Sequence, residues 1–135
     1  MRKILLILLF FCMISANVHA TPEQRAEFAK MPGFVSAYTY EDGECFLELE
    51  SISPEEYNPP RYQISVITYF ITDHTPTITV RSMTFRYHYA RQTIHLKGMD
   101  GKWYWLNPDE NPISMCQIQL ADLLFQQCYQ MPFFH

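Results

Sequence analysis

The sequence lacks the short motifs by which several enzyme classes are recognised. It contains no glycine-rich phosphate loop, no His-Glu-x-x-His zinc motif and no Gly-x-Ser-x-Gly nucleophile elbow. It also lacks an Asn-x-Ser/Thr glycosylation site, and no apolar run after residue 20 is long enough to span a membrane. We therefore predict a non-enzymatic protein with no cofactor and no transmembrane segment.

The first 20 residues are typical of a bacterial secretory signal peptide. Arg2 and Lys3 precede an apolar run over residues 4–14, and a small-x-small cleavage site ends at Ala20. Cys12 lies within this run, but the bulky residues before it do not match a lipid-attachment site. The pattern predicts export to the periplasm, the medium or the cell surface, with cleavage after Ala20. Residues 21–135 then form a single exported domain.

Charge is unevenly distributed along the exported chain, whose net charge is −6 once Arg2 and Lys3 are removed. Residues 41–56 carry seven acidic side chains and no basic one. Residues 81–102 carry five basic side chains against Asp100 alone. This separation suggests self-association or a charged partner, although two ordinary solvated faces of a sheet would give the same pattern.

Residues 77–106 predict three consecutive antiparallel strands. Asp100-Gly101 between apolar runs is a hairpin signal, and a second turn is expected at Arg91-Gln92. These turns place His88 opposite His95, Arg86 opposite Lys97, and Lys97 opposite Tyr104. One face then collects the apolar residues Phe85, Tyr87, Tyr89, Ile94, Leu96, Trp103 and Trp105. The other face collects Arg86, His88, His95, Lys97, Lys102 and Tyr104.

The rest of the chain predicts a further sheet and two helices. Residues 34–41 and 44–52 flank a hairpin turn at Asp42-Gly43, and residues 62–70 alternate as another strand. The apolar positions change parity near Arg81-Ser82, which predicts a β-bulge or a bend. A short N-terminal helix ends at Pro32-Gly33, and a C-terminal helix capped by Ser114 runs to Cys128.

These elements define an α+β fold. We predict an antiparallel meander sheet of about six strands, with the short N-terminal helix and with the C-terminal helix packed on the Trp103/Trp105 face.

The cysteines predict one disulfide, because an exported protein meets an oxidising compartment. Cys116 and Cys128 lie about 18 Å apart along a helix axis. A disulfide requires Cα atoms within about 7 Å, so these two cannot bond to each other. Cys45–Cys128 is the preferred pair and Cys45–Cys116 the alternative, with one thiol left over.

The basic face is the candidate binding site. Two histidines on adjacent strands could hold a metal ion, but Arg86 and Lys97 would repel a cation, so no metal site is predicted. The same groups suit a polyanion, an acidic protein segment or an anionic surface, and the histidines would add charge at low pH. An exported acidic protein is a poor candidate for binding nucleic acid.

Dispersed features resemble the surface-adhesin protein E family of Gram-negative bacteria. Residues 46–52 resemble an early strand of that family, Arg81-Ser82 and His95-Leu96 resemble its middle strands, and Leu120, Ala121 and Cys128 resemble its C-terminal helix. The match covers roughly residues 46–128. The family's middle-strand cysteine is replaced here by Ala90-Arg91, and the chain has no clear lipid-attachment cysteine.

This resemblance implies a small antiparallel sheet with a C-terminal helix, a capacity to form a homodimer, and binding to host matrix proteins. The leading hypothesis is therefore an adhesin-like binding protein that uses the basic face for a protein or polyanionic partner. The alternative is a periplasmic inhibitor or immunity-type protein that blocks an enzyme with its acidic 41–56 segment. A small secreted hydrolase is a third hypothesis, and it would require a pocket with convergent titratable groups.

Overall fold

The computed structural model describes residues 22–74 and 78–135. The predicted signal peptide and the cleavage site after Ala20 lie outside the described residues. The elements are α2 (Pro22–Lys30), β1 (Phe34–Tyr40), β2 (Gly43–Glu48), a single 3₁₀ turn η1 (Leu49–Ser51), β3 (Ser53–Asn58), β4 (Arg61–Thr72), β5 (Thr79–His88), β6 (Thr93–Lys97), β7 (Trp103–Trp105) and α3 (Pro112–Tyr129).

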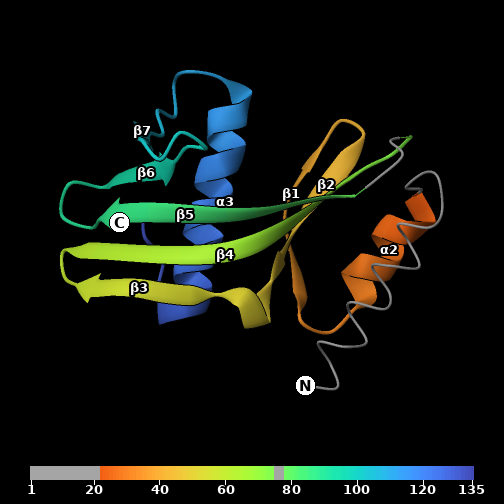
Figure 1. Cartoon of the computed structure of the whole chain (residues 1–135), viewed down its shortest axis with the longest axis horizontal. Coiled ribbons are helices and arrows are strands. Elements are labelled where there is room, and N and C mark those ends of the chain that lie inside the picture. Colours follow the sequence, from red (N-terminus) through yellow and green to blue (C-terminus); the bar gives the residue numbers. More distant parts are fainter. Residues whose placement is uncertain (1–21, 75–77) are drawn as a thin grey trace.

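The described strands form one antiparallel sheet of seven strands, which confirms the predicted α+β class (Figure 1). The strand order is β1-β2-β4-β5-β6-β7, and β3 also pairs with β4. The long strand β4 makes this branching possible, because its residues 61–65 pair with β3 and its residues 68–72 pair with β2. On its other side β4 pairs with β5 from Arg61–His88 to Phe70–Thr79 without interruption.

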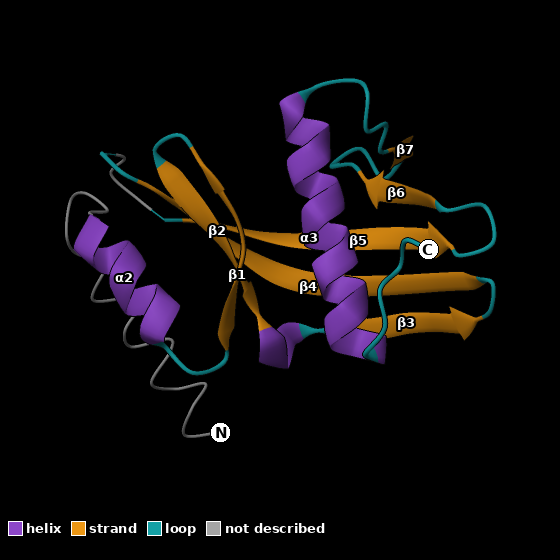
Figure 2. Ribbon diagram, turned by 180° about the vertical axis from the view of Figure 1, so that it is seen from behind, coloured by secondary structure: helices purple, strands orange, loops and turns teal. Residues whose placement is uncertain are grey.

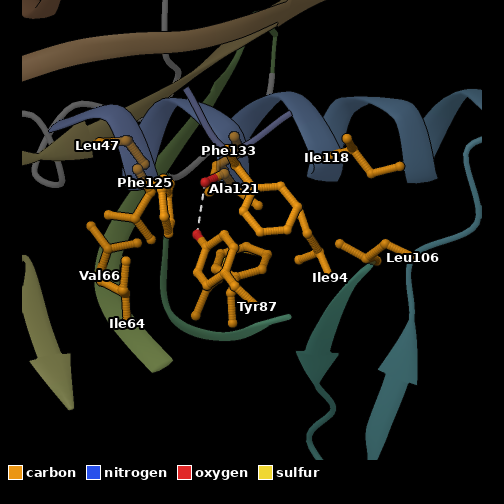
Figure 3. Packing of buried hydrophobic residues seen from close by; sticks show 14 of the residues in the cluster. Leu47, Ile64, Val66, Tyr87, Ile94, Leu106, Ile118, Ala121, Phe125 and Phe133 are labelled. Carbon is orange, nitrogen blue, oxygen red and sulfur yellow. Dashed lines mark hydrogen bonds between the residues drawn. The ribbon is translucent and has the colours of Figure 1, made fainter. Parts of the chain in front are cut away.

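The two helices cover opposite faces of the sheet at opposite ends (Figures 1 and 2). The larger cluster lies under α3 and joins Ile64, Val66 and Tyr87 to Ala121 and Phe125 (Figure 3). The smaller cluster lies against α2 and contains Phe28, Phe34, Phe46, Tyr69, Ile71 and Ile78. Burial along β4 changes from even to odd positions between Thr68 and Tyr69, where the covered face changes.

The change of covered face corrects the predicted β-bulge near Arg81-Ser82. The pairing of β4 with β5 keeps one register throughout, so no residue is inserted there. Ile78 is buried because it faces the α2 cluster, whereas Phe85 is buried because it faces α3. Val80 lies between the two regions and is 42% exposed. The parity change in the sequence therefore reflects which face of an unbroken strand is buried: the face towards α2 at one end and the face towards α3 at the other.

Helix α3 begins earlier than predicted. Asn111 is the N-cap: its side chain accepts a hydrogen bond of 2.9 Å from the Ser114 amide. Pro112 follows at the first helical position, where its missing N–H costs nothing. Ser114 is therefore inside the first turn and does not cap the helix. The helix ends at Gln130, which adopts a left-handed conformation with φ of 56°.

The segment after α3 folds back onto the sheet, which the sequence did not suggest. Phe133 is fully buried against the rings of Tyr87 and Phe125, at centroid distances of 5.3 Å from each. The Gln92 side chain donates to the Phe133 carbonyl at 2.8 Å and accepts from the His135 amide at 2.9 Å. The turn between β5 and β6 thus holds the chain end over the aromatic core.

The predicted disulfide is not present. Cys45, Cys116 and Cys128 are free thiols, so neither Cys45–Cys128 nor Cys45–Cys116 is bonded. Burial, opposed by a hydrogen bond with Tyr38, raises the pKa of the Cys45 thiol to about 12, and Cys116 adds a smaller contribution in the same direction. Neither the preferred pair nor its alternative is therefore formed.

A buried hydrogen bond between described residues ties the sheet to α3 and should be measurable in the free energy of unfolding. The buried Tyr87 hydroxyl donates to the Ala121 carbonyl at 2.7 Å (Figure 3). We expect Tyr87→Phe to lower the free energy of unfolding by about 1 kcal/mol in urea titrations. Tyr89 lies in the same aromatic cluster, and its hydroxyl bonds to no described residue. Tyr89→Phe is therefore the control, and equal losses for both variants would contradict the assignment.

Burial of Cys45 predicts a loss of stability at high pH. The thiol has a pKa of 9.0 in an exposed setting and about 12 in the fold, so the unfolded chain ionises first. This contribution is fully present below about pH 9 and is lost as the pH rises towards 12. Urea midpoints measured from pH 8 to pH 11 should fall, and less steeply in Cys45→Ala than in Cys116→Ala. An unchanged slope in Cys45→Ala would contradict this account.

Candidate functional site

Four of the predicted binding residues lie on one face of the sheet, although their partners differ from those predicted. The observed pairs are Arg86–His95, Tyr87–Ile94 and His88–Thr93, a shift of two residues from the predicted register. Because side chains alternate with a period of two, this shift leaves Arg86, His88, His95 and Lys97 on the predicted face. It removes the expected His88–His95 and Arg86–Lys97 oppositions, which were wrong.

The pairing of β6 with β7 differs by one residue from the prediction, and this difference exchanges the two faces. Trp103 lies opposite Lys97 and Trp105 opposite His95, so both tryptophans lie on the basic face and not under α3. Trp105 is 53% exposed. The Trp103/Trp105 face was therefore the wrong surface for α3, which packs on the residues of β4, β5 and β6 that point the other way.

The sequence placed Tyr104 and Lys102 on the basic face, but neither lies there. Tyr104 lies opposite Leu96, and its hydroxyl donates to the Asp100 carboxylate. Gly98 leaves room for this contact, since a Cβ there would lie 2.6 Å from the Tyr104 ring. Lys102 precedes β7, and its backbone amide donates to Asp100 at 2.9 Å. Both residues serve the turn between β6 and β7.

Two arginines that the sequence did not identify complete the site. Arg61 lies opposite His88 on β4, and Arg91 lies in the turn after β5. A surface cleft of about 430 Å³ opens between these elements. Its lining is formed by Glu56, Arg61, Tyr62, Arg86, Tyr87, His88, Arg91, Thr93 and His95. Three arginines and two histidines therefore line one cleft, together with Glu56.

The Arg86 side chain is held in place by neighbours on both sides. Its Nε donates to the Gln63 side chain at 2.9 Å, and its guanidinium lies 4.0 Å from the centre of the Trp103 ring. Gln63 in turn donates to Glu55 at 2.9 Å. Within the described residues the two terminal nitrogens of Arg86 make no hydrogen bond, so they are available to a ligand.

Glu55 anchors the other end of this row as a carboxylate. It accepts hydrogen bonds from Gln63 and from the Ser65 hydroxyl, the latter at 2.8 Å. These two hydrogen bonds lower the pKa of the Glu55 carboxyl below its usual value. The row from Glu55 through Gln63 to Arg86 and Trp103 thus runs from β3 to β7. It crosses the sheet face opposite α3, called here the open face.

His88 has a defined role in the turn beside the cleft. Its Nδ1 accepts a hydrogen bond of 3.1 Å from the Arg91 amide, which places the proton of the neutral ring on Nε2. The contact orders the turn that carries Arg91. His88 therefore helps to position a second cation at the cleft rather than pairing with His95.

The acidic segment of residues 41–56 does not form a single surface. It is divided among β2, η1 and β3, and several of its carboxylates are bonded within the fold. Glu44 accepts from the Ser36 hydroxyl at 2.5 Å and forms an ion pair of 3.5 Å with Arg25. Glu55 belongs to the open face described above. The charge run in the sequence is therefore distributed over different parts of the molecule.

The described residues contain no group of three or more His, Cys, Asp or Glu side chains arranged to hold a metal ion. In the same part of the chain, no helix combines the length and the apolar character needed to cross a membrane. Comparisons with protein-family models, curated proteins and solved structures found no match.

The stacking of Arg86 on Trp103 can be tested with a double-mutant cycle. The free energy of unfolding is measured for Arg86→Ala, Trp103→Ala and the double variant. We expect a coupling of about 0.5–1 kcal/mol, the usual size of a cation–π contact at an exposed site. The same cycle with Trp105, which lies opposite His95, should give a coupling near zero. Equal couplings for the two tryptophans would contradict a specific stack.

Proposed function

We propose that the protein is an exported, non-enzymatic binding protein that contacts an anionic partner through the basic cleft of its open sheet face. The observation that supports this proposal most directly is that Arg61, Arg86 and Arg91 line the same cleft. Arginine presents several donors in a fixed plane and binds carboxylate, sulfate or phosphate groups in pairs of hydrogen bonds. A partner with several closely spaced anionic groups would satisfy all three.

The surroundings of the cleft also support binding. Arg86 is already oriented by Gln63 and Trp103, so less side-chain freedom is lost when a ligand forms contacts. Lys97 and the exposed ring of Trp105 extend the same face beyond the cleft. The opposite face in this region is filled by α3, so the open face is the surface left for a partner.

Export and adhesion belong to the same proposal. Export rests on the signal-peptide pattern of residues 1–20, and adhesion rests on the resemblance to the surface-adhesin protein E family. In this account the anionic partner is an acidic region of a host matrix protein or the sulfated polysaccharide associated with it. Long-range attraction to such a partner would raise the association rate and weaken as salt increases.

Charge reversal at the cleft tests the proposal. Heparin serves as the sulfated probe, and binding is measured by calorimetry at several salt concentrations. We expect Arg86→Glu to weaken binding at least about tenfold and to reduce its salt dependence, because one cationic contact becomes repulsive. Lys30→Glu, at the exposed end of α2, changes the net charge equally and should have little effect.

A parallel measurement uses surfaces coated with extracellular-matrix protein. Arg61→Glu should reduce retention on such a surface in the same proportion as it reduces heparin binding. If neither variant changes binding to either probe, the cleft is not the binding site. Capture of one periplasmic enzyme through residues 41–56 would instead favour the inhibitor hypothesis.

A further inference from the structure

An apolar groove of about 440 Å³ opens at the end of the sheet where β6 begins and β7 ends. It lies between these strands, the first half of α3 and the last residues of the chain. Seven of its ten lining residues are apolar, and the other three are Arg91, Gln92 and Thr93. Clefts of this size with mostly apolar walls and few polar groups are the usual form of small-molecule sites.

The apolar lining has a buried floor and an exposed rim. The buried residues of the floor are Ile94, Leu106 and Ile118, at one end of the larger cluster (Figure 3). The exposed residues of the rim are Trp105, Met115 and Phe134. Large apolar side chains that are exposed together around a hollow are a feature of ligand-binding grooves, whereas single ones are common on any surface.

The part of the rim formed by the chain end is held in place by hydrogen bonds. Phe134 lies between Phe133, which is fully buried, and His135, whose amide donates to the Gln92 side chain at 2.9 Å. The Phe133 amide donates to the Asp122 carboxylate at 3.0 Å. Little conformational freedom is therefore lost at the chain end when a ligand enters the groove.

The polar side chains that a ligand could use lie at one boundary of the groove. The Gln92 side chain is already bonded to the Phe133 carbonyl and the His135 amide. The Arg91 guanidinium and the Thr93 hydroxyl make no hydrogen bond or ion pair to the described residues. Arg91 and Thr93 also line the basic cleft, so the two cavities meet at these residues.

The charges at this boundary favour an anionic group. Among the described residues that line the groove, Arg91 is the only one with a formal charge. The adjoining cleft adds Arg61 and Arg86, against the carboxylate of Glu56. A head group at the boundary is therefore attracted if it is anionic and repelled if it is cationic.

The rest of the ligand must be apolar and short. At the roughly 30 Å³ that one water molecule occupies in the liquid, the groove accommodates at most about fifteen non-hydrogen atoms. The floor is aliphatic, and it offers no side-chain partner for the amides and carbonyls that a peptide would bring. A hydrocarbon chain fits this lining without leaving buried polar groups unpaired.

We propose that the apolar groove binds a single-chain amphiphile, an aliphatic chain of about ten carbon atoms that ends in a carboxylate or a similar anionic group. The chain lies on the floor of the groove, and the head group lies at the boundary with the cleft, beside Arg91 and Thr93. The site shares these two residues with the basic cleft but does not depend on the function proposed for it.

A series of alkanoates tests the chain by calorimetry on the whole protein. We expect decanoate to bind with a Kd below about 1 mM. Affinity should rise about tenfold from octanoate to decanoate, because each buried methylene contributes about fourfold, and it should level off at tetradecanoate, whose chain exceeds the groove. The NMR methyl signals of Ile94, Leu106 and Ile118 should shift. Equal affinity for octanoate and decanoate, an unbroken rise to tetradecanoate, or shifts confined to other residues would overturn the proposal.

Two methionines provide a matched pair of variants. Met115 is 40% exposed on the rim, and Met131 is 37% exposed and lies outside the groove. Met115→Glu introduces a carboxylate beside the chain and should weaken decanoate binding at least about tenfold. A glutamate near the start of α3 also suits the helix dipole, so the variant should fold. Met131→Glu changes the net charge equally and should bind within about twofold of the wild type. Equal effects of the two variants would contradict the assigned groove.

Exchange of charge tests the head group. Octanoate and octylammonium have the same chain and opposite charges, and the wild-type protein should bind octanoate at least about tenfold more tightly. Arg91→Glu should weaken octanoate binding and strengthen octylammonium binding. If the wild type binds the two ligands equally, or if Arg91→Glu leaves their ratio unchanged, the anionic head group is wrong.

Further measurements distinguish this ligand from other occupants and from the partner of the basic cleft. Met115→Glu should leave heparin binding unchanged, so the groove and the cleft can fail separately. If light scattering shows a dimer that Met115→Glu dissociates, the groove belongs to a second copy of the chain. If the protein binds vesicles of anionic phospholipid but not free decanoate, the groove contacts a membrane surface. Either of these two results would overturn the proposal.

Discussion

The continuous pairing of β4 with β5 is the constraint on which the rest of the molecule depends. Ten residue pairs follow one register, so each face of the two strands runs unbroken from one end to the other. The α2 cluster covers one face at one end, and α3 covers the opposite face at the other end. Helix α3 leaves the surface behind it open. The basic cleft lies on the open surface opposite α3, so its position follows from the placement of the two cores.

The sequence predicts this fold as far as alternation and turn residues can define it. Alternation assigns Arg86, His88, His95 and Lys97 to one face, even though the turn between β5 and β6 is two residues longer than expected and Thr93 pairs with His88 instead of Ala90. Alternation fails at residues 103–105, where three consecutive aromatic residues fit either face. There the turn decides, and the contact of Tyr104 with Asp100 sets the register that places both tryptophans beside the cations.

The cleft itself could not be predicted from local sequence. Arg61 lines the cleft because β4 pairs with β5 in a register that places Arg61 opposite His88. The sequence between the two strands, residues 73–78, contains no recognisable two-residue turn signal that would predict this register. Arg91 was treated as a turn residue, and its contribution depends on the hydrogen bond from its amide to His88. Both contributions come from long-range geometry. The clustering of basic residues in the sequence identified the face on which the cleft lies, but not all of the cations that line it.

A basic sheet face is tolerated here because its charges are separated by neutral groups. Gln63 lies opposite Arg86 on one side, and Trp103 receives the guanidinium on the other. These contacts occupy Nε and one face of the guanidinium, and its terminal nitrogens make no hydrogen bond to the described residues. A face built only for solubility would need neither the stack nor the Glu55–Gln63 row behind it. The order imposed on Arg86 therefore supports the proposal that the cleft binds a ligand.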